Sequence, residues 1–515
     1  MNTKVRTRFA PSPTGPLHMG GVRTALFAYL FAKQHHGDFL LRIEDTDQNR
    51  YVPGAEEYII EALNWCGIKI DEGVPVGGPH APYRQSERKE LGIYKKYAEQ
   101  LVSSGHAYYA FDSAEEIEAM RNRLNNAGEV APQYNSNSRM TMINSLTLSE
   151  SDVKEKINAG VPYVIRLKMP VGEDVSFTDI IRGVVTVNSS LVDDKVLLKS
   201  DGMPTYHLAH IVDDVLMEIT HAIRGEEWLP SAPAHIMIYR YLGWENKMPH
   251  YAHLPLLLKP DGNGKLSKRD GDRLGFPVFP LNWTDPNTGE LSSGYRERGY
   301  YPEAFVNMLA FLGWNPGTEQ EIFSMEELIK SFSFEHVHKS GARFDPEKTK
   351  WFNEQYLRLQ PVEKLSENMK VAVSKEFQFD TNDYRLSDKF LNRAVMLLKD
   401  RVHFESEMIA TGRYLFEAPA GYDQTVISKK WKPELLPFFQ ELISAFKALT
   451  EFNLLNIDAT IKATAASKQI KAGEIMQLLR VFVSGQGGGV DLLGMIELLG
   501  KEEVVRRLEK ALEKF

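Results

Sequence analysis

The spacing of apolar residues changes twice within the first fifty positions. Val5, Thr7 and Phe9 alternate with charged positions, which predicts a short buried strand. From Val22 to Gln34 the apolar residues recur at helical spacing. Phe39 to Ile43 then forms a second apolar run of strand length. A strand, a helix and a strand of this size make a right-handed crossover, so we expect a parallel, doubly wound sheet.

The pattern changes again further along the chain. From about residue 107 to 196, polar helical stretches mix with short strand-like runs, which predicts an inserted α+β domain. After about residue 346 helical periods dominate. We therefore expect an α/β fold: a Rossmann-type parallel nucleotide-binding sheet in two halves, the inserted domain, a connecting region and an all-α C-terminal half. The expected boundaries are 1–106 and 197–258 for the two halves, 107–196 for the insertion, 259–345 for the connecting region and 346–515 for the helical region.

A loop rich in proline and glycine joins the first strand to the first helix. Gly20 and Gly21 at its end allow a large flat group to lie close to the backbone. The unpaired N–H groups of a helix start suit an anion, and His18 can donate to a phosphate oxygen. These features suit attack on the α-phosphate of a nucleotide, where positioning and charge stabilisation supply most of the catalysis. A structural turn whose histidine caps the helix would leave the same pattern.

Composition limits the classes of protein and site that fit. The 515 residues are 43% hydrophobic and 25% charged, which is ordinary for a globular chain of three or four domains. The net charge of −8 does not advertise nucleic-acid binding, but a local basic face remains compatible with it. The single cysteine, Cys66, excludes an intrachain disulfide and a multi-cysteine zinc site. We see no run of membrane-spanning length and, ahead of the first strand, no room for a targeting peptide.

Four sequence motifs carry a family resemblance. Ala10 to Gly15 (APSPTG) and Arg42 to Asp47 (RIEDTD) resemble the signature of the glutamyl- and glutaminyl-tRNA synthetases, which are class I aminoacyl-tRNA synthetases. His18 to Gly21 is similar to the family's HIGH motif, and Lys265 to Arg269 (KLSKR) to its KMSKS loop. A glutaminyl enzyme of the eukaryotic type would have β-barrels after residue 346. The helical pattern there makes the chain similar to the bacterial-type glutamyl enzymes.

The resemblance implies a set of site residues. Glu44 would hold the α-amino group of glutamate, while Arg8, Tyr206 and Arg224 would hold its side chain. Two arginines would leave a neutral amide poorly satisfied, which favours glutamate over glutamine. His18 and Lys268 would act on the phosphates as the catalytic residues. The full implied sets are Ser12, His18, Gly20, Gly21, Lys265, Ser267 and Lys268 for ATP, and Arg8, Ser12, Glu44, Tyr206 and Arg224 for glutamate.

The resemblance also implies an activity and partners. The chain would attach L-glutamate to tRNA(Glu) through a glutamyl-adenylate, using ATP with Mg²⁺ and often requiring bound tRNA for activation. The insertion would hold the acceptor end, residues 259–345 would contact the stem, and Arg393 and Arg401 in the helical region would read the anticodon. Some relatives carry a zinc knuckle in the insertion. Here that stretch has no cysteine, so we expect neither zinc nor another resident metal. We expect a cytoplasmic monomer.

Several alternatives stay open at this point. The enzyme could also charge the glutamine tRNA with glutamate, or a synthetase-like chain could bind tRNA or an adenylate without aminoacylation. His210 stands where some relatives have asparagine, so any contact that it makes with substrate is undecided. Residues 276–299 are rich in proline, glycine and aromatic residues, and we expect a surface insertion with two turns.

Overall fold

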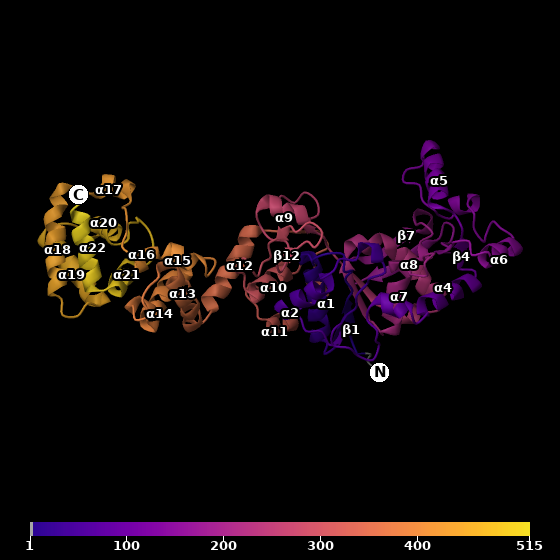
Figure 1. The fold of residues 1–515 in the computed structure, drawn as a ribbon, viewed down its shortest axis with the longest axis horizontal. Helices are drawn as coiled ribbons and strands as arrows, with labels where there is room; N and C mark the ends of the chain where they lie inside the picture. The colour runs from indigo at the N-terminus through magenta and orange to yellow at the C-terminus, as the bar shows by residue number, and fades with distance from the viewer. Residues whose placement is uncertain (1–3) are drawn as a thin grey trace. The chain divides into compact units, whose positions relative to one another are not determined.

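The computed structural model describes residues 4–515, except for the side chains of Lys268, Arg269, Asp272 and Ala472. The described chain forms two compact units (Figure 1). The first runs to Arg298 and resumes over Pro302–Thr349, and the second comprises Gly299–Tyr301 and Lys350–Phe515. None of the described helices is both long and apolar enough to cross a membrane.

The first unit is built on a seven-stranded sheet with the order β3-β2-β1-β9-β10-β6-β7. Neighbouring strands are parallel except at the edge, where β7 is antiparallel to β6. The predicted parallel sheet is thereby confirmed. Its strands are β1 (Arg6–Phe9), β2 (Asp38–Leu41), β3 (Glu72–Gly73), β6 (Asp174–Asp179), β7 (Gly183–Asn188), β9 (His221–Gly225) and β10 (His250–Leu254).

Helix α1 packs against the centre of this sheet. It contacts β1, β2 and β9, and its apolar face, including Val22, Leu26 and Leu30, is fully buried. Gly37 follows the helix where a Cβ atom would stand 2.2 Å from the Val5 carbonyl oxygen, so only glycine fits this return to the sheet. The helices of this part are α1 (Met19–Gln34), α2 (Ala55–Trp65), α3 (Gln85–Lys89), α4 (Ile93–Ser103), α7 (Tyr206–Leu216) and α8 (Ala232–Tyr241).

The region between residues 107 and 196 contributes to two sheets. A small antiparallel sheet has the strand order β4-β5-β8, and the helices α5 and α6 lie between β4 and β5 in the sequence. The β6–β7 hairpin instead joins the main sheet, because β6 pairs with β10. Residue 197, where we expect the second half of the nucleotide-binding domain to begin, lies within β8. The elements are β4 (Ala107–Ala110), α5 (Ala114–Asn126), α6 (Glu150–Asn158), β5 (Val164–Leu167) and β8 (Val196–Leu198).

The connecting region corrects one expectation. Residues 276–299 are not simply a surface insertion: Phe276, Val278 and Phe279 are buried, and the exposed residues gather at the tip of the β12–β13 hairpin and at 296–299. The Tyr58 hydroxyl donates to the Leu281 carbonyl oxygen at 2.6 Å and anchors the segment to α2. The elements here are β11 (Leu257–Leu258), α9 (Lys268–Leu274), β12 (Trp283–Thr284), β13 (Leu291–Ser292), α10 (Pro302–Phe311), α11 (Met325–Ser331) and β14 (Ala342–Arg343).

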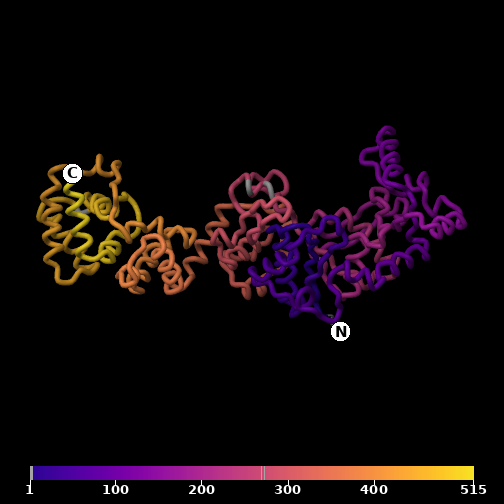
Figure 2. The backbone as a smooth tube through the Cα atoms, viewed as in Figure 1, coloured from indigo at the N-terminus to yellow at the C-terminus, as the bar shows by residue number. Residues whose placement is uncertain are grey.

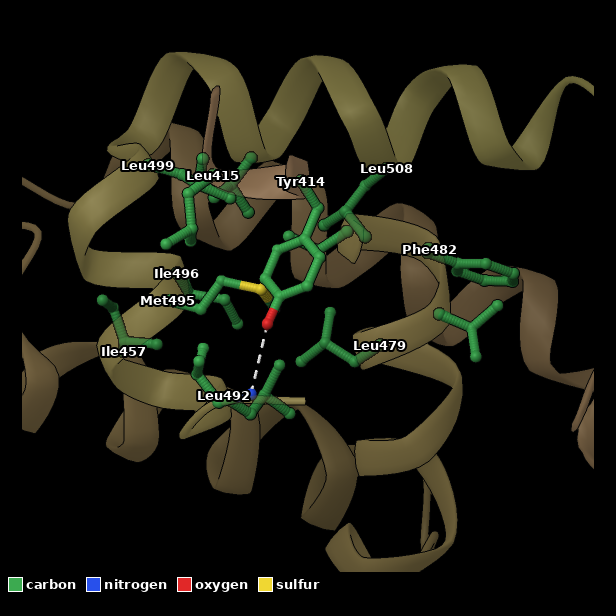
Figure 3. Packing of buried hydrophobic residues seen from close by; sticks show 14 of the residues in the cluster. Tyr414, Leu415, Ile457, Leu479, Phe482, Leu492, Met495, Ile496, Leu499 and Leu508 are labelled. Atoms are coloured by element: carbon green, nitrogen blue, oxygen red, sulfur yellow. Dashed lines mark hydrogen bonds between the residues drawn. The ribbon is translucent and has the colours of Figure 1, made fainter. Parts of the chain in front are cut away.

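The second unit is helical throughout its described residues, as predicted, and is coloured orange to yellow in Figure 2. Helices α18, α19, α20 and α22 pack side by side around one apolar core. Tyr414 lies in that core and its hydroxyl accepts a hydrogen bond from the Val490 backbone N–H at 3.2 Å (Figure 3). The helices are α12 (Pro346–Leu359), which crosses the division, α13 (Val362–Phe377), α14 (Asp388–Leu398), α15 (Glu407–Thr411), α16 (Arg413–Phe416), α17 (Gln424–Lys430), α18 (Leu436–Ala448), α19 (Leu454–Ser467), α20 (Ala472–Ser484), α21 (Leu492–Leu499) and α22 (Lys501–Leu512).

Candidate active site

A cleft of about 860 Å³ opens at the C-terminal ends of β1, β2 and β9. Open α/β sheets bind their ligands at this edge, where loops and helix starts surround the strand ends. The cleft brings together residues that the sequence distributes over more than 200 positions. The predicted site residues that line it are Arg8, Ser12, Gly20, Gly21, Glu44, Tyr206 and Arg224.

Arg8 belongs to a buried cluster of alternating charges. Its Nε donates to Asp214 Oδ1 at 3.1 Å, and Arg42 Nη1 donates to the same oxygen at 2.8 Å. Arg42 Nη2 in turn donates to Glu44 Oε1 at 2.8 Å. The cluster therefore holds two cations and two anions, and it fixes Arg8 and Glu44 at the wall of the cleft.

The two acids of this cluster respond differently to burial. Burial raises the pKa of the Glu44 carboxyl above its usual range, although Arg42 and Arg8 act in the opposite direction. Burial would also raise the pKa of Asp214, but Arg8 and Arg42 together hold it well below its usual range. Asp214 is therefore a permanent anion at neutral pH, whereas Glu44 is the more easily protonated of the two.

Arg224 is held on the other side of the cleft by uncharged partners. Its Nη1 donates to the Tyr206 hydroxyl at 2.9 Å, and its Nε donates to His253 Nε2 at 2.9 Å. The guanidinium also lies over the ring of Tyr251, with 4.7 Å between its carbon and the ring centroid. Only 5% of Arg224 is exposed, so burial and these contacts restrict its orientation.

His18 occupies the N-cap of α1. Its Nδ1 accepts a hydrogen bond from the Gly20 N–H at 3.1 Å, so the ring proton sits on Nε2, which is then a donor. The next residue, Met19, donates its N–H to the Val278 carbonyl oxygen at 2.9 Å, and the ring of Phe279 meets His18 edge-on. The capping interpretation of this histidine is thus confirmed. His18 does not line the cleft, and its Nε2 atom is buried.

The KLSKR loop precedes α9. Lys265 Nζ lies 3.0 Å from Glu227 Oε1, and the Ser267 side chain caps α9 through Asp270, to which its Oγ donates at 2.5 Å. Neither Lys265 nor Ser267 lines the cleft, although Glu227 does. The side chain of Lys268, our expected catalytic cation, lies outside the described residues.

The predicted anticodon residues lie in the second unit. Arg393 is half-buried on α14, and its Nη2 lies 3.2 Å from Glu497 Oε2. Arg401 ends the short 3₁₀ turn Lys399–Arg401 and is exposed. These positions leave the guanidinium of Arg401 accessible, whereas that of Arg393 is engaged in an ion pair.

Two further expectations concern His210, whose contact with substrate was undecided, and a resident metal, which we expect to be absent. His210 is fully buried behind Tyr206, with the two rings stacked 4.5 Å apart, and it does not line the cleft. Across the described part of the chain, no three His, Cys, Asp or Glu side chains gather in a way that could hold a metal ion. The absence of zinc stays a prediction.

Residues that support the cleft were largely missed from the sequence. Asp214 sits in an apolar helical stretch, and His253 and Asp179 sit in β10 and β6, which pair with each other although they lie far apart in the chain. Lys199, whose Nζ donates to the Thr46 carbonyl oxygen at 2.8 Å, and Trp228 also line the cleft. Two polar residues in an apolar stretch, as at Asp213 and Asp214, were the one available signal.

Comparisons with known proteins agree with this arrangement. The family described as tRNA synthetases class I (E and Q), catalytic domain, matches residues 4–351, and an anticodon binding domain matches residues 358–512. The glutamate–tRNA ligase of Cytophaga hutchinsonii is 55% identical over 99% of this chain and 98% of its own length. That of Parabacteroides distasonis is 53% identical over 99% of each chain.

Solved structures agree as well. A glutamate tRNA ligase from Elizabethkingia meningosepticum, in complex with its amino acid, has a TM-score of 0.92 and 50% identity over 99% of each chain. The glutamate–tRNA synthetase of Elizabethkingia anophelis has a TM-score of 0.91 and 49% identity over 99% of this chain and 100% of its own. The chain therefore belongs to the class I tRNA synthetases of the E and Q group, among the glutamate–tRNA ligases.

Proposed function

We propose that this protein attaches L-glutamate to tRNA(Glu) in two steps. An α-carboxylate oxygen of glutamate attacks the α-phosphorus of ATP, and pyrophosphate leaves with the electrons of the broken P–O bond. A terminal ribose hydroxyl of the tRNA then attacks the acyl carbon of the glutamyl-adenylate, AMP leaves with the electrons of the broken C–O bond, and the hydroxyl proton passes to the leaving phosphate. Neither step needs a strong general base, so the protein's task is to position the reactants and stabilise charge.

The observation that carries this proposal is the charge arrangement of the cleft. Glu44 offers one carboxylate to an α-ammonium group, while Arg8, Tyr206 and Arg224 offer donors to a carboxylate. Arginine forks bind planar oxyanions in a bidentate fashion, which a neutral side-chain amide cannot match. Glutamate therefore satisfies the cleft better than glutamine does. Ser12, at the rim of the cleft, serves both substrates in this proposal.

For ATP we propose the loop and helix start at the cleft. Gly20 and Gly21 line it, so a phosphate can lie close to the backbone there. We assign phosphate stabilisation to the Nε2 proton of His18 and to Lys268, with Lys265 and Ser267 in supporting roles. Mg²⁺ enters as part of the substrate, because the ion neutralises triphosphate oxygens.

The tRNA contacts are proposed by region. We assign the acceptor end to residues 107–196, the stem to residues 259–345 and the anticodon to residues 346–515, with Arg393 and Arg401 as readers. The named cleft residues all come from one chain, so the proposal needs no second copy and we propose a monomer. We place the reaction in the cytoplasm, where the tRNA substrate is available.

The test is a side-by-side assay with purified tRNAs. Glutamate-dependent exchange of pyrophosphate into ATP in the presence of tRNA should be measured first, followed by charging of glutamate and glutamine tRNAs. We expect exchange with glutamate, little with glutamine, and charging of tRNA(Glu). A protein that binds tRNA but supports neither exchange nor charging would be a synthetase-like binding protein, and the proposal would fail.

A further inference from the structure

Behind Arg224 lies a buried chain of hydrogen bonds that no part of the proposed mechanism uses. It runs across three neighbouring strands, from Asp179 at the end of β6, through His253 in β10, to Arg224 in β9. His253 is the direct cross-strand partner of Arg224, and Asp179 pairs with Tyr251, two residues before His253. Asp179 and His253 are 1% and 0% exposed, so solvent does not compete for these contacts.

The donors and acceptors along this chain admit one arrangement of protons. The Nε of an arginine always carries a proton, so His253 Nε2, at 2.9 Å, must accept. The His253 proton therefore sits on Nδ1, which donates to Asp179 Oδ2 at 2.6 Å. Burial lowers the pKa of His253 despite the adjacent carboxylate, which keeps the ring neutral as this arrangement requires.

Asp179 is itself fixed by the backbone. Its Oδ1 accepts from the N–H groups of Ile181 and Arg182 at 2.9 and 2.8 Å, and its Oδ2 also accepts from the His253 N–H at 3.1 Å. Three backbone donors therefore aim the carboxylate at the imidazole. The β6–β7 hairpin, which joins the main sheet from within the expected insertion, supplies this fixed point.

We infer that Asp179 and His253 are positioning residues for substrate: Asp179 selects the tautomer of His253, and His253 orients the Arg224 guanidinium toward the side-chain carboxylate of glutamate. This inference rests on the proposed function, because it assigns Arg224 to glutamate. Arg224 lines the cleft, and its Nη1 and Nη2 lie 3.4 and 3.5 Å from His235 Nδ1. If the tautomer of His253 changed, its Nε2–H would face the Nε–H of Arg224, and the guanidinium would turn away.

Two variants of His253 separate this role from simple packing. The amide of His253→Gln reaches the position of Nε2, so its carbonyl oxygen keeps an acceptor for Arg224. The amide of His253→Asn reaches only the position of Nδ1, so it keeps a donor for Asp179 and loses the acceptor. Both changes replace a buried aromatic ring by a smaller amide, so they form a matched pair for packing losses.

The assay is tRNA-dependent pyrophosphate exchange over a range of glutamate concentrations. We expect His253→Asn to raise the KM for glutamate about tenfold or more, the scale of one lost charge-assisted hydrogen bond, with kcat and the KM for ATP changed far less. His253→Gln should stay within about threefold of the wild type on the same scale. Thermal unfolding of both variants checks that each is folded.

A third variant tests the tautomer directly. Asp179→Asn offers the ring an N–H donor, which favours the wrong tautomer, so it should also raise the KM for glutamate. In the His253→Gln background the same change should have little further effect, which a double-mutant cycle measures. Asp194→Asn is the control, since Asp194 is equally buried but binds Tyr108 and Arg139 in the inserted region. It should lower stability and leave the KM for glutamate unchanged.

The outcomes distinguish failure of the positioning role from failure of the proposed function. An active wild type whose His253→Asn and His253→Gln variants have the same KM for glutamate would overturn the positioning role alone. The positioning role would also be overturned if Asp179→Asn raised the KM for glutamate by the same factor in the wild type and in the His253→Gln variant. A wild type with no glutamate-dependent exchange would overturn the proposed function and this inference with it.

Discussion

The replacement Asp214→Asn removes the shared anion of the buried cluster while keeping its shape. In the wild type, one oxygen of Asp214 accepts from Arg8 at 3.1 Å and from Arg42 at 2.8 Å, and both arginines are almost fully buried. The variant retains a carbonyl oxygen at the same place but no charge. Arg42 then keeps Glu44 as its contacting anion, with Asp213 Oδ2 3.9 Å from Arg42 Nε, while Arg8 loses the anion to which its Nε donates.

The expected cost follows from this geometry. Each attraction between unit charges about 4 Å apart amounts to about 4 kcal/mol at an effective dielectric constant near 20. Two such attractions are lost, but the variant no longer buries the carboxylate charge, which relieves several kcal/mol. We therefore expect the free energy of unfolding to fall by about 3 kcal/mol, near the lower end for a broken buried ion pair. A protein of ordinary stability, about 5–15 kcal/mol, would remain folded.

The same change should weaken glutamate binding, because the amide oxygen that remains is uncharged and holds Arg8 less firmly. Loss of a whole charge-assisted hydrogen bond, about 1.5–3 kcal/mol, would raise the KM for glutamate about 10- to 150-fold, which sets the upper limit of the expected increase. Urea unfolding followed by tryptophan fluorescence measures the first effect, and pyrophosphate exchange the second. The native pKa of Asp214 is depressed, so its stabilisation is complete above its unfolded pKa, and the difference between variant and wild type should shrink below about pH 4.

Asp213→Asn is the matched control on the same helix. Asp213 is also buried and accepts from Arg88 at 2.6 Å, Gln85 at 2.9 Å and Tyr94 at 2.9 Å, all away from Arg8. The Asp213→Asn variant should lose about as much stability as Asp214→Asn, but its KM for glutamate should stay at the wild-type value. The reasoning is refuted if the two variants raise this KM equally, or if Asp214→Asn leaves stability within about 0.5 kcal/mol, the range of ordinary surface changes.

Further expectations concern pH, catalysis, metal content and tRNA choice. Because burial raises the pKa of Glu44 above the ordinary value of 4.5, acidification should protonate Glu44 at a pH above that value and so raise the KM for glutamate. Glu44→Gln should abolish this pH dependence, and a KM that still rises in the variant would contradict the role of Glu44 in binding the α-ammonium group. His18→Ala and Lys268→Ala should each slow adenylate formation at least about 10²-fold with little change in glutamate binding, and near-normal exchange would exclude them as phosphate donors. Metal analysis of chelator-washed protein should find no stoichiometric zinc; one zinc per chain would show that a site was missed. Arg401→Gln should raise charging of a CUG-anticodon glutamine tRNA relative to the glutamate tRNA, and an unchanged ratio would leave Arg401 as a helix-end charge.

The local part of the fold was predictable from the sequence. The strand, helix and strand of the first fifty residues appear as β1, α1 and β2, because their apolar spacing matches their own secondary structure. Strand β6 was not found. Its inward side chains are Val175, Phe177 and Asp179, a short alternation ending in an acid, and its partner β10 lies about seventy residues further on. The hairpin with β7 is local, but the pairing of β6 with β10, which brings Asp179 to the site, leaves no local signal.

The segment 276–281 shows the opposite failure. Its proline and glycine content indicated a surface loop, yet Phe276, Val278 and Phe279 are buried against the start of α1 and against α9. Gly271 of α9 permits this, because a Cβ atom there would stand 2.7 Å from a methyl group of Val278. Proline and glycine content indicates that the backbone turns, but the burial of the side chains depends on which part of the protein packs against the turn.

The site residues that contact the cleft were predicted by resemblance, while the residues that hold them were not, and the difference has a physical consequence. Arg8 touches its acid directly, through Asp214, so much of its charge is already compensated. Arg224 contacts uncharged groups, the Tyr206 hydroxyl, His253 Nε2 and His235 Nδ1, and the acid along the His253 chain, Asp179, stands one imidazole further away. Doubling the separation of two charges halves their attraction. The interposed ring therefore leaves the charge of Arg224 less compensated than that of Arg8, which suits Arg224 to the side-chain carboxylate that we assign to it together with Arg8 and Tyr206.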